Sequence, residues 1–152
     1  MTFTEERKDI FRYADTWKEE PFYFAHCISA DFALGAGIAV DFKKRYRLTP
    51  ENLTAGRVYK NLSIVGNVFN LITKDRYWQK PTYASLSGAV DNMRKCCEAL
   101  GVKKLVMPKI GCGLDRLNWS IVKQIIKEKF VETDIDIIVC YIYDDRKEAK
   151  WL

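Results

Sequence analysis

The chain contains a single histidine, His26, among 152 residues. That count excludes a zinc site built on several imidazoles. It also excludes a serine–histidine–aspartate triad together with a second histidine. No apolar run approaches the roughly 18 residues that a membrane-spanning helix requires, and the polar first nine residues are unlike a signal peptide. We therefore expect no metal ion and no membrane partner.

Paired cysteines are also missing. The chain has an odd number of cysteines and no Cys-x-x-Cys motif, so the sequence indicates neither a disulfide framework nor a zinc or redox motif. Reduced thiols are typical of proteins in the cytoplasm or nucleus, where we expect this protein. Cys112 stands between two glycines, but as a nucleophile it would need His26 as its base. Nothing in the sequence brings these two residues together.

The glycine motifs of common nucleotide-binding proteins are absent. Neither Gly-x-Gly-x-x-Gly nor Gly-x-x-x-x-Gly-Lys-Ser/Thr occurs, which disfavours a nicotinamide dehydrogenase and a P-loop nucleotidase. Two shorter motifs, Gly35-Ala36-Gly37 and Gly111-Cys112-Gly113, each lie between a predicted strand and a predicted helix. Backbone N–H groups at such crossings attract phosphate, and ligands of open α/β sheets bind at the carboxyl ends of strands. Two facing loops would suit a diphosphate, and the five surplus positive charges also favour an anionic ligand.

The residues that are present predict one folded domain. Hydrophobic residues make up 48% of the chain and no linker or repeat divides it, so we expect a single domain over residues 1–152 with a charged tail at 144–152. Apolar runs predict strands, and apolar periodicity predicts helices that begin near residues 38, 82 and 119. Their alternation predicts an α/β domain of three layers, α/β/α, with a central mixed sheet. The predicted strands are 22–28, 58–60, 67–73, 104–110 and 136–143, with a hairpin through Gly66.

Two charged residues near the same predicted sheet edge are candidates for chemistry. Lys74 ends the strand at 67–73, and Asp115 follows the second glycine loop by two residues. A neutral lysine amine can act as a nucleophile and a carboxylate as a general base. From spacing alone, however, a solvated strand end and a capping or ion-paired carboxylate explain the two residues better.

A resemblance to a known family rests on five segments: Phe24–Ser29, Gly35–Lys44, Leu71–Lys74, Lys80–Tyr83 and Met107–Leu117. In sequence and order they resemble macrodomains, most of all the terminal ADP-ribose protein glycohydrolases, also described as O-acetyl-ADP-ribose deacetylases. The resemblance extends from about Asp9 to Ile142. It implies an α/β/α sandwich that binds ADP-ribose, in agreement with the diphosphate crevice predicted above.

The resemblance also implies roles for individual residues. Lys74 would displace the acyl group and form a Schiff base with the opened ribose, and Asp115 would activate ribose hydroxyls and water. Asp9 and Ile10 would contact adenine, and Ser29 would face the distal ribose. The remaining residues expected to bind the substrate are His26, Gly35, Ala36, Gly37, Ile38, Thr73, Lys109, Ile110, Gly111, Cys112, Gly113, Leu114 and Ile142.

The implied function is a hydrolase that removes mono-ADP-ribose from acidic side chains, or acetate from O-acetyl-ADP-ribose. It would need no cofactor, and ADP-ribose would be its ligand or product. The expected partners are an ADP-ribosylated protein or an ADP-ribose ester, with ADP-ribosylated nucleic acid as a further candidate, and we expect a monomer. Three alternatives stay open: an ADP-ribose reader without activity, an ADP-ribose 1″-phosphate phosphatase, and removal of ADP-ribose from nucleic acid bases.

Overall fold

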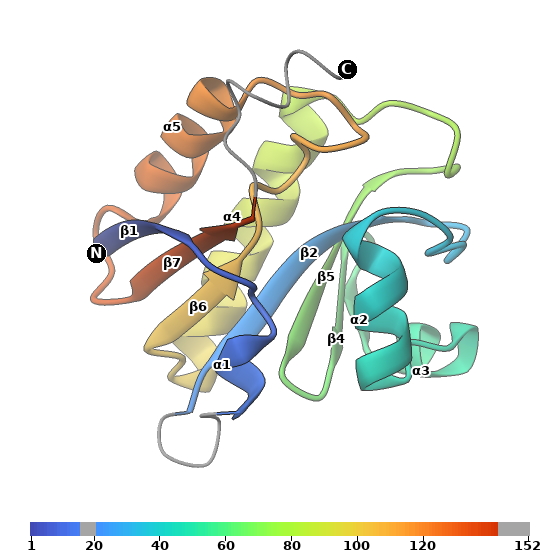
Figure 1. The fold of residues 1–152 in the computed structure, drawn as a ribbon, viewed down its shortest axis with the longest axis horizontal. Coiled ribbons are helices and arrows are strands. Elements are labelled where there is room, and N and C mark those ends of the chain that lie inside the picture. Colours follow the sequence, from blue (N-terminus) through green and yellow to red (C-terminus); the bar gives the residue numbers. More distant parts are fainter. Residues whose placement is uncertain (16–20, 143–152) are drawn as a thin grey trace.

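The computed structural model describes residues 1–15 and 21–142, so the predicted tail at 144–152 lies outside the described residues. Seven strands form one sheet in the order β1-β7-β6-β2-β5-β4-β3 (Figure 1). The first five strands in this order pair in parallel, and β4 and β3 complete one side in antiparallel pairing. The strands are β1 (Thr2–Arg7), β2 (Tyr23–Ser29), β3 (Arg57–Tyr59), β4 (Leu62–Val65), β5 (Val68–Lys74), β6 (Lys104–Met107) and β7 (Asp136–Tyr141).

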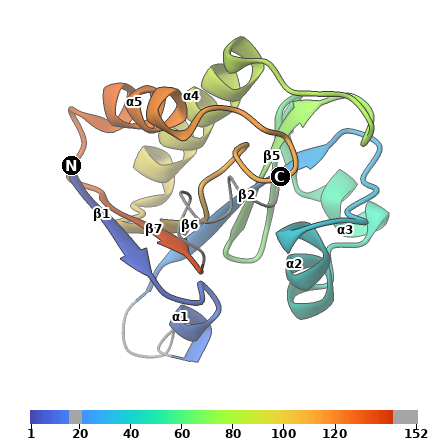
Figure 2. The ribbon, with the colours of Figure 1, turned by 45° about the horizontal axis from the view of Figure 1, so that its top comes forward.

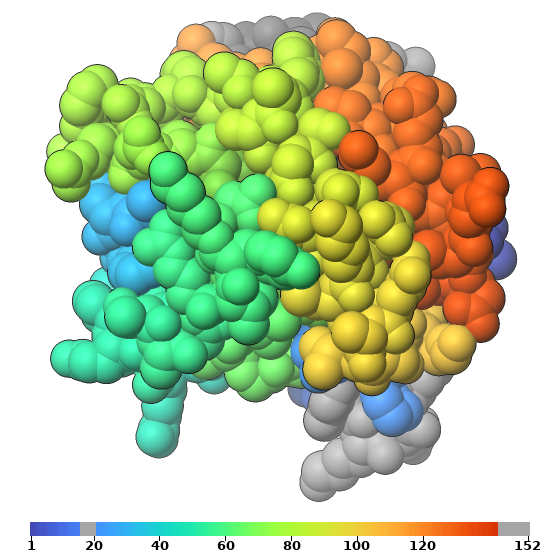
Figure 3. Space-filling view, turned by 180° about the vertical axis from the view of Figure 1, so that it is seen from behind, coloured from blue at the N-terminus to red at the C-terminus, as the bar shows by residue number. Residues whose placement is uncertain are grey.

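Helices cover both faces of this sheet. On one face lie α4 (Tyr83–Leu100) and α5 (Trp119–Phe130), which Figure 3 shows in yellow and orange from behind. On the other face lie α1 (Arg12–Asp15), α2 (Ile38–Tyr46) and α3 (Pro50–Ala55) (Figure 2). The three layers and the mixed sheet confirm the predicted fold class.

Each face of the sheet has its own apolar core. Side chains alternate between the two faces along a strand, so on β5 Leu71 joins the cluster under α4 and α5, whereas Ile72 joins the cluster that contains α2 and α3. In the second cluster Phe42 is fully buried between Phe11 and Phe24, at ring-centroid distances of 4.9 and 5.7 Å. Helices on both faces explain why β5 is buried from Val68 to Thr73 and why β7 has the apolar run Ile137–Cys140.

Local end signals place the long helices where the sequence predicted them. Thr82 and Ser85 form a reciprocal capping box at the start of α4, and Gly101 ends that helix with a φ of 70°. Asn118 caps α5 by accepting a hydrogen bond from the Ser120 N–H. Such signals act within one turn, so they can be recognised without knowledge of the fold.

The elements that the sequence analysis missed are short or polar. β1 alternates poorly in polarity and lies at a sheet edge, where its backbone pairs only with β7. The hairpin through Gly66 joins β4 to β5, not the predicted strand at 58–60, which is the edge strand β3. The predicted strands at 104–110 and 136–143 end earlier, at Met107 and Tyr141.

The described part of the chain has neither a membrane-spanning helix nor a cluster of metal ligands. No helix there is both long and apolar enough to cross a bilayer. Within residues 1–15 and 21–142, no three His, Cys, Asp or Glu side chains are grouped in a way that could hold a metal ion.

Candidate functional site

Lys74 and Asp115 meet at the carboxyl end of the parallel strands. Lys74 ends β5 opposite Ser29, the last residue of β2, and the Ala30 N–H donates to the Lys74 carbonyl at 2.9 Å. The Lys74 Nζ lies 2.6 Å from Asp115 Oδ1, and only 14% and 17% of the two side chains are exposed. The structure therefore brings together the two residues that the resemblance paired, 41 positions apart in the chain.

The loop between β6 and α5 holds Asp115 in this position. In Figure 2 this loop, in orange, passes near the ends of β2 and β5. The Leu117 N–H donates to the Gly111 carbonyl at 2.8 Å, and Lys80 Nζ donates to the Leu114 carbonyl at 2.9 Å. Gly111 has a φ of 71°, and a Cβ there would lie 3.0 Å from the Leu117 side chain, so the tight turn suits glycine.

The two glycine loops lie against each other. Gly37 caps α2 with a φ of 62°, and a Cβ at this position would lie 3.3 Å from Leu114 on the other loop. The first loop leads directly into α2, whose N-terminal amides are free of a side-chain cap. The second loop is separated from α5 by five residues, 114–118, so the helix-terminus argument for an anion applies to the first loop alone.

The residues expected at adenine come together at the neighbouring strands. The Lys8 N–H donates to the Tyr141 carbonyl at 2.9 Å, and Arg7 Nε donates to the Ile142 carbonyl at 3.2 Å. This places the segment with Asp9 beside Ile142, which is exposed. Asp9 itself is exposed and accepts from the Phe11 N–H at 3.0 Å, which leaves one carboxylate oxygen for a ligand.

The remaining predicted contacts differ in exposure. Gly35, Ala36, Gly113 and Leu114 are exposed at the loops. The residues Ile38, Gly111, Cys112 and Lys109 are half-buried, and Lys109 Nζ lies 4.4 Å from the centre of the Tyr141 ring. Four others are almost fully buried: Ile10, Ser29, Thr73 and Ile110. For these four, any contact with a ligand would have to come through a small exposed part of the residue.

His26 differs from the other predicted contacts because it has no exposed surface. Its side chain is fully buried, its Nε2–H donates a hydrogen bond to Asn70 Oδ1 at 2.6 Å, and its ring stacks on Phe42 at 4.3 Å. Because it lies inside the core between β2 and α2, it has no surface for a ligand to contact. The structure therefore gives no support to the prediction that His26 binds the substrate.

The burial of His26 makes stability depend on pH. Burial lowers the pKa of His26 to about 4, against an opposing effect of the Asn70 hydrogen bond. In the unfolded chain the His26 imidazole takes up a proton near its ordinary pKa of about 6.5, whereas in the folded chain it stays neutral until about pH 4. We therefore expect this group to lower the free energy of unfolding by about 3 kcal/mol between pH 7 and pH 4, measured by urea denaturation.

A His26→Gln variant provides the control for this pH dependence. Glutamine does not titrate, so the free energy of unfolding of the variant should fall less than that of the wild type over the same range. Equal losses in both proteins would show that carboxylates alone cause the pH dependence.

Three residues near the pair were not identified from the sequence. Asp31 and Lys80 hold the loops around the site, and the Cys27 thiol lies beneath the pair. Burial, followed by the Asp115 carboxylate, raises the pKa of Cys27, so it remains a neutral thiol. Of these three residues, only Asp31 has a local sequence signal. It accepts a hydrogen bond from the N–H of Ala33, two residues later, as in an Asx-turn.

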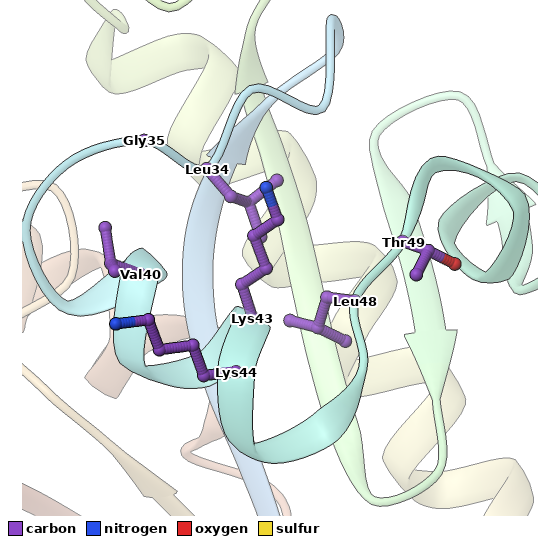
Figure 4. Close-up of a pocket in the computed structure, with 7 residues that line it drawn as sticks. All are labelled: Leu34, Gly35, Val40, Lys43, Lys44, Leu48 and Thr49. Atoms are coloured by element: carbon purple, nitrogen blue, oxygen red, sulfur yellow. The ribbon is translucent and has the colours of Figure 1, made fainter.

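A separate hollow of about 410 Å³ lies beside α2 and shares Gly35 with the first glycine loop (Figure 4). Neither Lys74 nor Asp115 lines it. Its floor is apolar, and two exposed lysines stand at its rim. The lining residues are Leu34, Gly35, Val40, Lys43, Lys44, Leu48 and Thr49.

The chain is similar to known proteins in both sequence and fold. No family model matches the chain. It is 44% identical over 119 residues to the human ADP-ribose glycohydrolase OARD1, covering 76% of this chain and 78% of that protein. The bovine OARD1 is 44% identical over 118 residues, covering 75% and 78%.

Solved structures that are similar to this chain support the fold. The macrodomain of Mycobacterium tuberculosis DarG has a TM-score of 0.78 at 20% identity, covering 91% of this chain and 97% of that one. Thermosipho africanus DarTG, in complex with ADP-ribose, has a TM-score of 0.72 at 14% identity, covering 97% and 44%. The chain therefore belongs to the macrodomain family, in the group of ADP-ribose glycohydrolases that contains OARD1.

Proposed function

We propose that the protein hydrolyses the ester bond between the anomeric carbon of ADP-ribose and a carboxyl group, that of an acidic side chain or of acetate. The observation that carries this proposal is the 2.6 Å pair of Lys74 and Asp115 at the carboxyl ends of β2 and β5. In this proposal Lys74 is the nucleophile and Asp115 is the proton acceptor. Membership of the glycohydrolase group supports the reaction type.

The ion pair supplies the first proton transfer. An ammonium group has no lone pair, so Lys74 can attack only after it gives up a proton, and Asp115 Oδ1 lies within hydrogen-bond distance to take it. The neutral amine then attacks the anomeric carbon, and the bond from that carbon to the carboxylate breaks. The nitrogen then loses its second proton to the departing carboxylate, and Asp115 gives its proton to the ring oxygen as the ribose opens. The products of this step are the protonated Schiff base, the carboxylic acid and an ionised Asp115.

Water completes the cycle. The ionised Asp115 takes a proton from water as it adds to the imine carbon, and then returns that proton to the nitrogen. The C–N bond breaks, the new hydroxyl gives its proton to the departing amine, and ADP-ribose is released. The overall change is the ester plus water to the carboxylic acid plus ADP-ribose. Lys74 returns to its ion pair with Asp115, and no redox change occurs.

The glycine loops would hold the diphosphate during these steps. The α2 terminus at Gly37 offers backbone N–H groups and the positive end of a helix dipole. Holding the diphosphate there positions the anomeric carbon against the Lys74 amine, which is a large part of the rate gain in such reactions.

A panel of linkages tests the proposed function. The protein is incubated with ADP-ribose linked to glutamate, to serine, to guanine, to acetate and to phosphate at the 1″ position, and released ADP-ribose is measured by chromatography. We expect release from the glutamate and acetate esters to exceed release from the serine and guanine linkages at least about 10-fold, because a carboxylate leaves without a proton. Phosphate also leaves as an anion, so faster release from the 1″-phosphate than from the esters would indicate a phosphatase and contradict the proposal. Binding of ADP-ribose without release from any substrate would contradict the proposal and indicate a reader.

Gly37→Ala tests the role of the first loop. A Cβ would strain the backbone at a φ of 62° and would lie 3.3 Å from the Leu114 side chain, so the first loop or that side chain would have to shift. We expect ADP-ribose to bind about 10-fold more weakly, a loss of about 1.4 kcal/mol by calorimetry.

Gly113→Ala is the matched control for that variant. A Cβ at Gly113 would meet no atom within 4 Å, so binding should remain within about two-fold of the wild type. Equal losses in both variants would mean that the contact between the loops does not matter for the ligand.

A further inference from the structure

We propose that Asp31 is a positioning residue of the site: its carboxylate joins the segment before the first glycine loop to the loop that follows Lys74 and sets the direction of the Ser29 hydroxyl. The proposal rests on the proposed function, since positioning has meaning only for a reacting ligand. Asp31 follows the end of β2 by two residues, and no role was predicted for it from the sequence.

Three hydrogen bonds converge on this one carboxylate. Asp31 Oδ1 accepts from the Ser29 hydroxyl at 2.5 Å and from the Ala33 N–H at 3.2 Å. Asp31 Oδ2 accepts from the Tyr77 N–H at 2.9 Å. Burial alone would raise the pKa of Asp31, but these hydrogen bonds hold it below its ordinary value, so the group is ionised at neutral pH.

On one side, the carboxylate holds a strained loop. Phe32 and Leu34 have φ values of 55° and 40°, in the left-handed region that side chains rarely adopt. The Asp31 bond to Ala33 lies between these two residues, and Gly35 and Gly37 follow directly. Strain of this kind persists only where the surroundings enforce it, so the Asp31–Ala33 bond helps to hold the strained segment at Phe32–Leu34, which precedes the first glycine loop.

On the other side, the carboxylate holds the turn after β5. The Gln79 N–H donates to the Arg76 carbonyl at 3.0 Å, and the Gln79 side chain accepts from the Arg76 N–H at 2.8 Å. Tyr77, the second residue of this turn, donates to Asp31. Because the turn begins only two residues after Lys74, fixing it restricts the strand end that carries the nucleophile.

Asp31 also determines what Ser29 can do. A serine hydroxyl has one proton, and Ser29 donates it to Asp31, so its oxygen can only accept a further hydrogen bond. Ser29 is the register partner of Lys74 on the neighbouring strand. A ribose hydroxyl held by Ser29 would therefore donate to it, which orients the sugar toward the lysine amine.

Asp31→Asn tests the proposal with little change in size. If the asparagine oxygen accepts from Ser29 and Ala33, its NH₂ group must face the Tyr77 N–H, donor against donor. We expect kcat on the acetyl ester to fall about 100-fold, the cost of a misplaced reacting group, while the Kd for ADP-ribose changes less than about five-fold. A loss of kcat and binding in equal measure, with a lower Tm, would show a merely structural role and overturn the proposal.

Two variants at Tyr77 separate its N–H from its ring. Tyr77→Pro removes the N–H donor at a turn position that proline favours, whereas Tyr77→Ala keeps the N–H and removes a ring that is 66% exposed. We expect about a 10-fold loss of kcat in Tyr77→Pro and less than two-fold in Tyr77→Ala. Equal losses in the two variants would overturn the role of the Asp31–Tyr77 bond. This pair also tests the proposal if Asp31→Asn fails to fold.

A double-mutant cycle with Ser29→Ala completes the test. If Asp31 acts partly by directing the Ser29 hydroxyl, Asp31→Ala, which removes the acceptor of that hydroxyl, should cost less kcat in the Ser29→Ala protein than in the wild type. Strictly additive losses would overturn that part of the proposal. The absence of turnover in the wild type would refute the proposed function and this role together, whereas wild-type turnover with an unchanged kcat in Asp31→Asn would refute the role of Asp31 alone.

Discussion

Lys74→Ala is expected to release ADP-ribose from its acetyl ester at least about 1,000-fold more slowly than the wild type, because the variant lacks the proposed nucleophile. Binding of ADP-ribose should stay within about three-fold, since the diphosphate is held by the glycine loops and the α2 terminus. Turnover is measured by single-turnover chromatography and binding by calorimetry. The split between the two readouts separates chemistry from affinity.

Lys74→Arg is the matched control for the covalent step. Arginine keeps the positive charge beside Asp115, but its guanidinium stays protonated and is a poor nucleophile. A nucleophilic role predicts that Lys74→Arg is as inactive as Lys74→Ala. Substantial activity in Lys74→Arg would mean that the charge alone serves the reaction, and full activity in Lys74→Ala would exclude the covalent mechanism.

Asp115→Asn has the second largest expected effect. The amide cannot take the proton of Lys74 or of the attacking water, so we expect ADP-ribose release to fall about 100- to 1,000-fold. Any Schiff base that does form would resolve slowly. Treatment with cyanoborohydride should then trap ADP-ribose on Lys74 in a larger fraction of Asp115→Asn molecules than of wild-type molecules, as measured by intact mass and peptide mapping.

Asp75→Asn controls for the loss of one negative charge near the lysine. Asp75 is the neighbour of Lys74 in the chain and is exposed, and it has no ion pair with Lys74 among the described residues. Its variant should retain at least about half of the wild-type rate if the proton acceptor is Asp115 alone.

The cyanoborohydride experiment has its own contradicting outcomes. A reduced ADP-ribose adduct in the Lys74→Ala protein, or no adduct in any variant, would argue against an imine on Lys74.

The helices and central strands were predictable because their signals are local. The apolar stripe of α4, its Thr82 cap and its Gly101 stop all lie within one segment of chain. The polar edge strand β1 carries no such signal, since it exists through its pairing with β7, which is distant in sequence. The six-residue helix α3 does carry a local signal, the Thr49 cap followed by Pro50, but the sequence analysis did not use it.

The sequence indicated which residues belong to the site, but not which of them contact one another. The resemblance paired Lys74 with Asp115, and the sheet brings them to 2.6 Å. It also proposed His26, which the alternation along β2 directs into the core against Phe42. Asp31 was overlooked because its importance comes from an N–H donor 46 residues away.

The sequence by itself determined the layered α/β class, the helix ends and the supply of chemistry: one histidine, two glycine loops and a lysine with a distant aspartate. Only the tertiary structure decided which of these groups meet. The reason is physical: hydrogen bonds and proton transfers require atoms within about 3 Å, and strand register and loop packing set those distances. The Ser29 hydroxyl, which its contact with Asp31 makes an acceptor, is the clearest case.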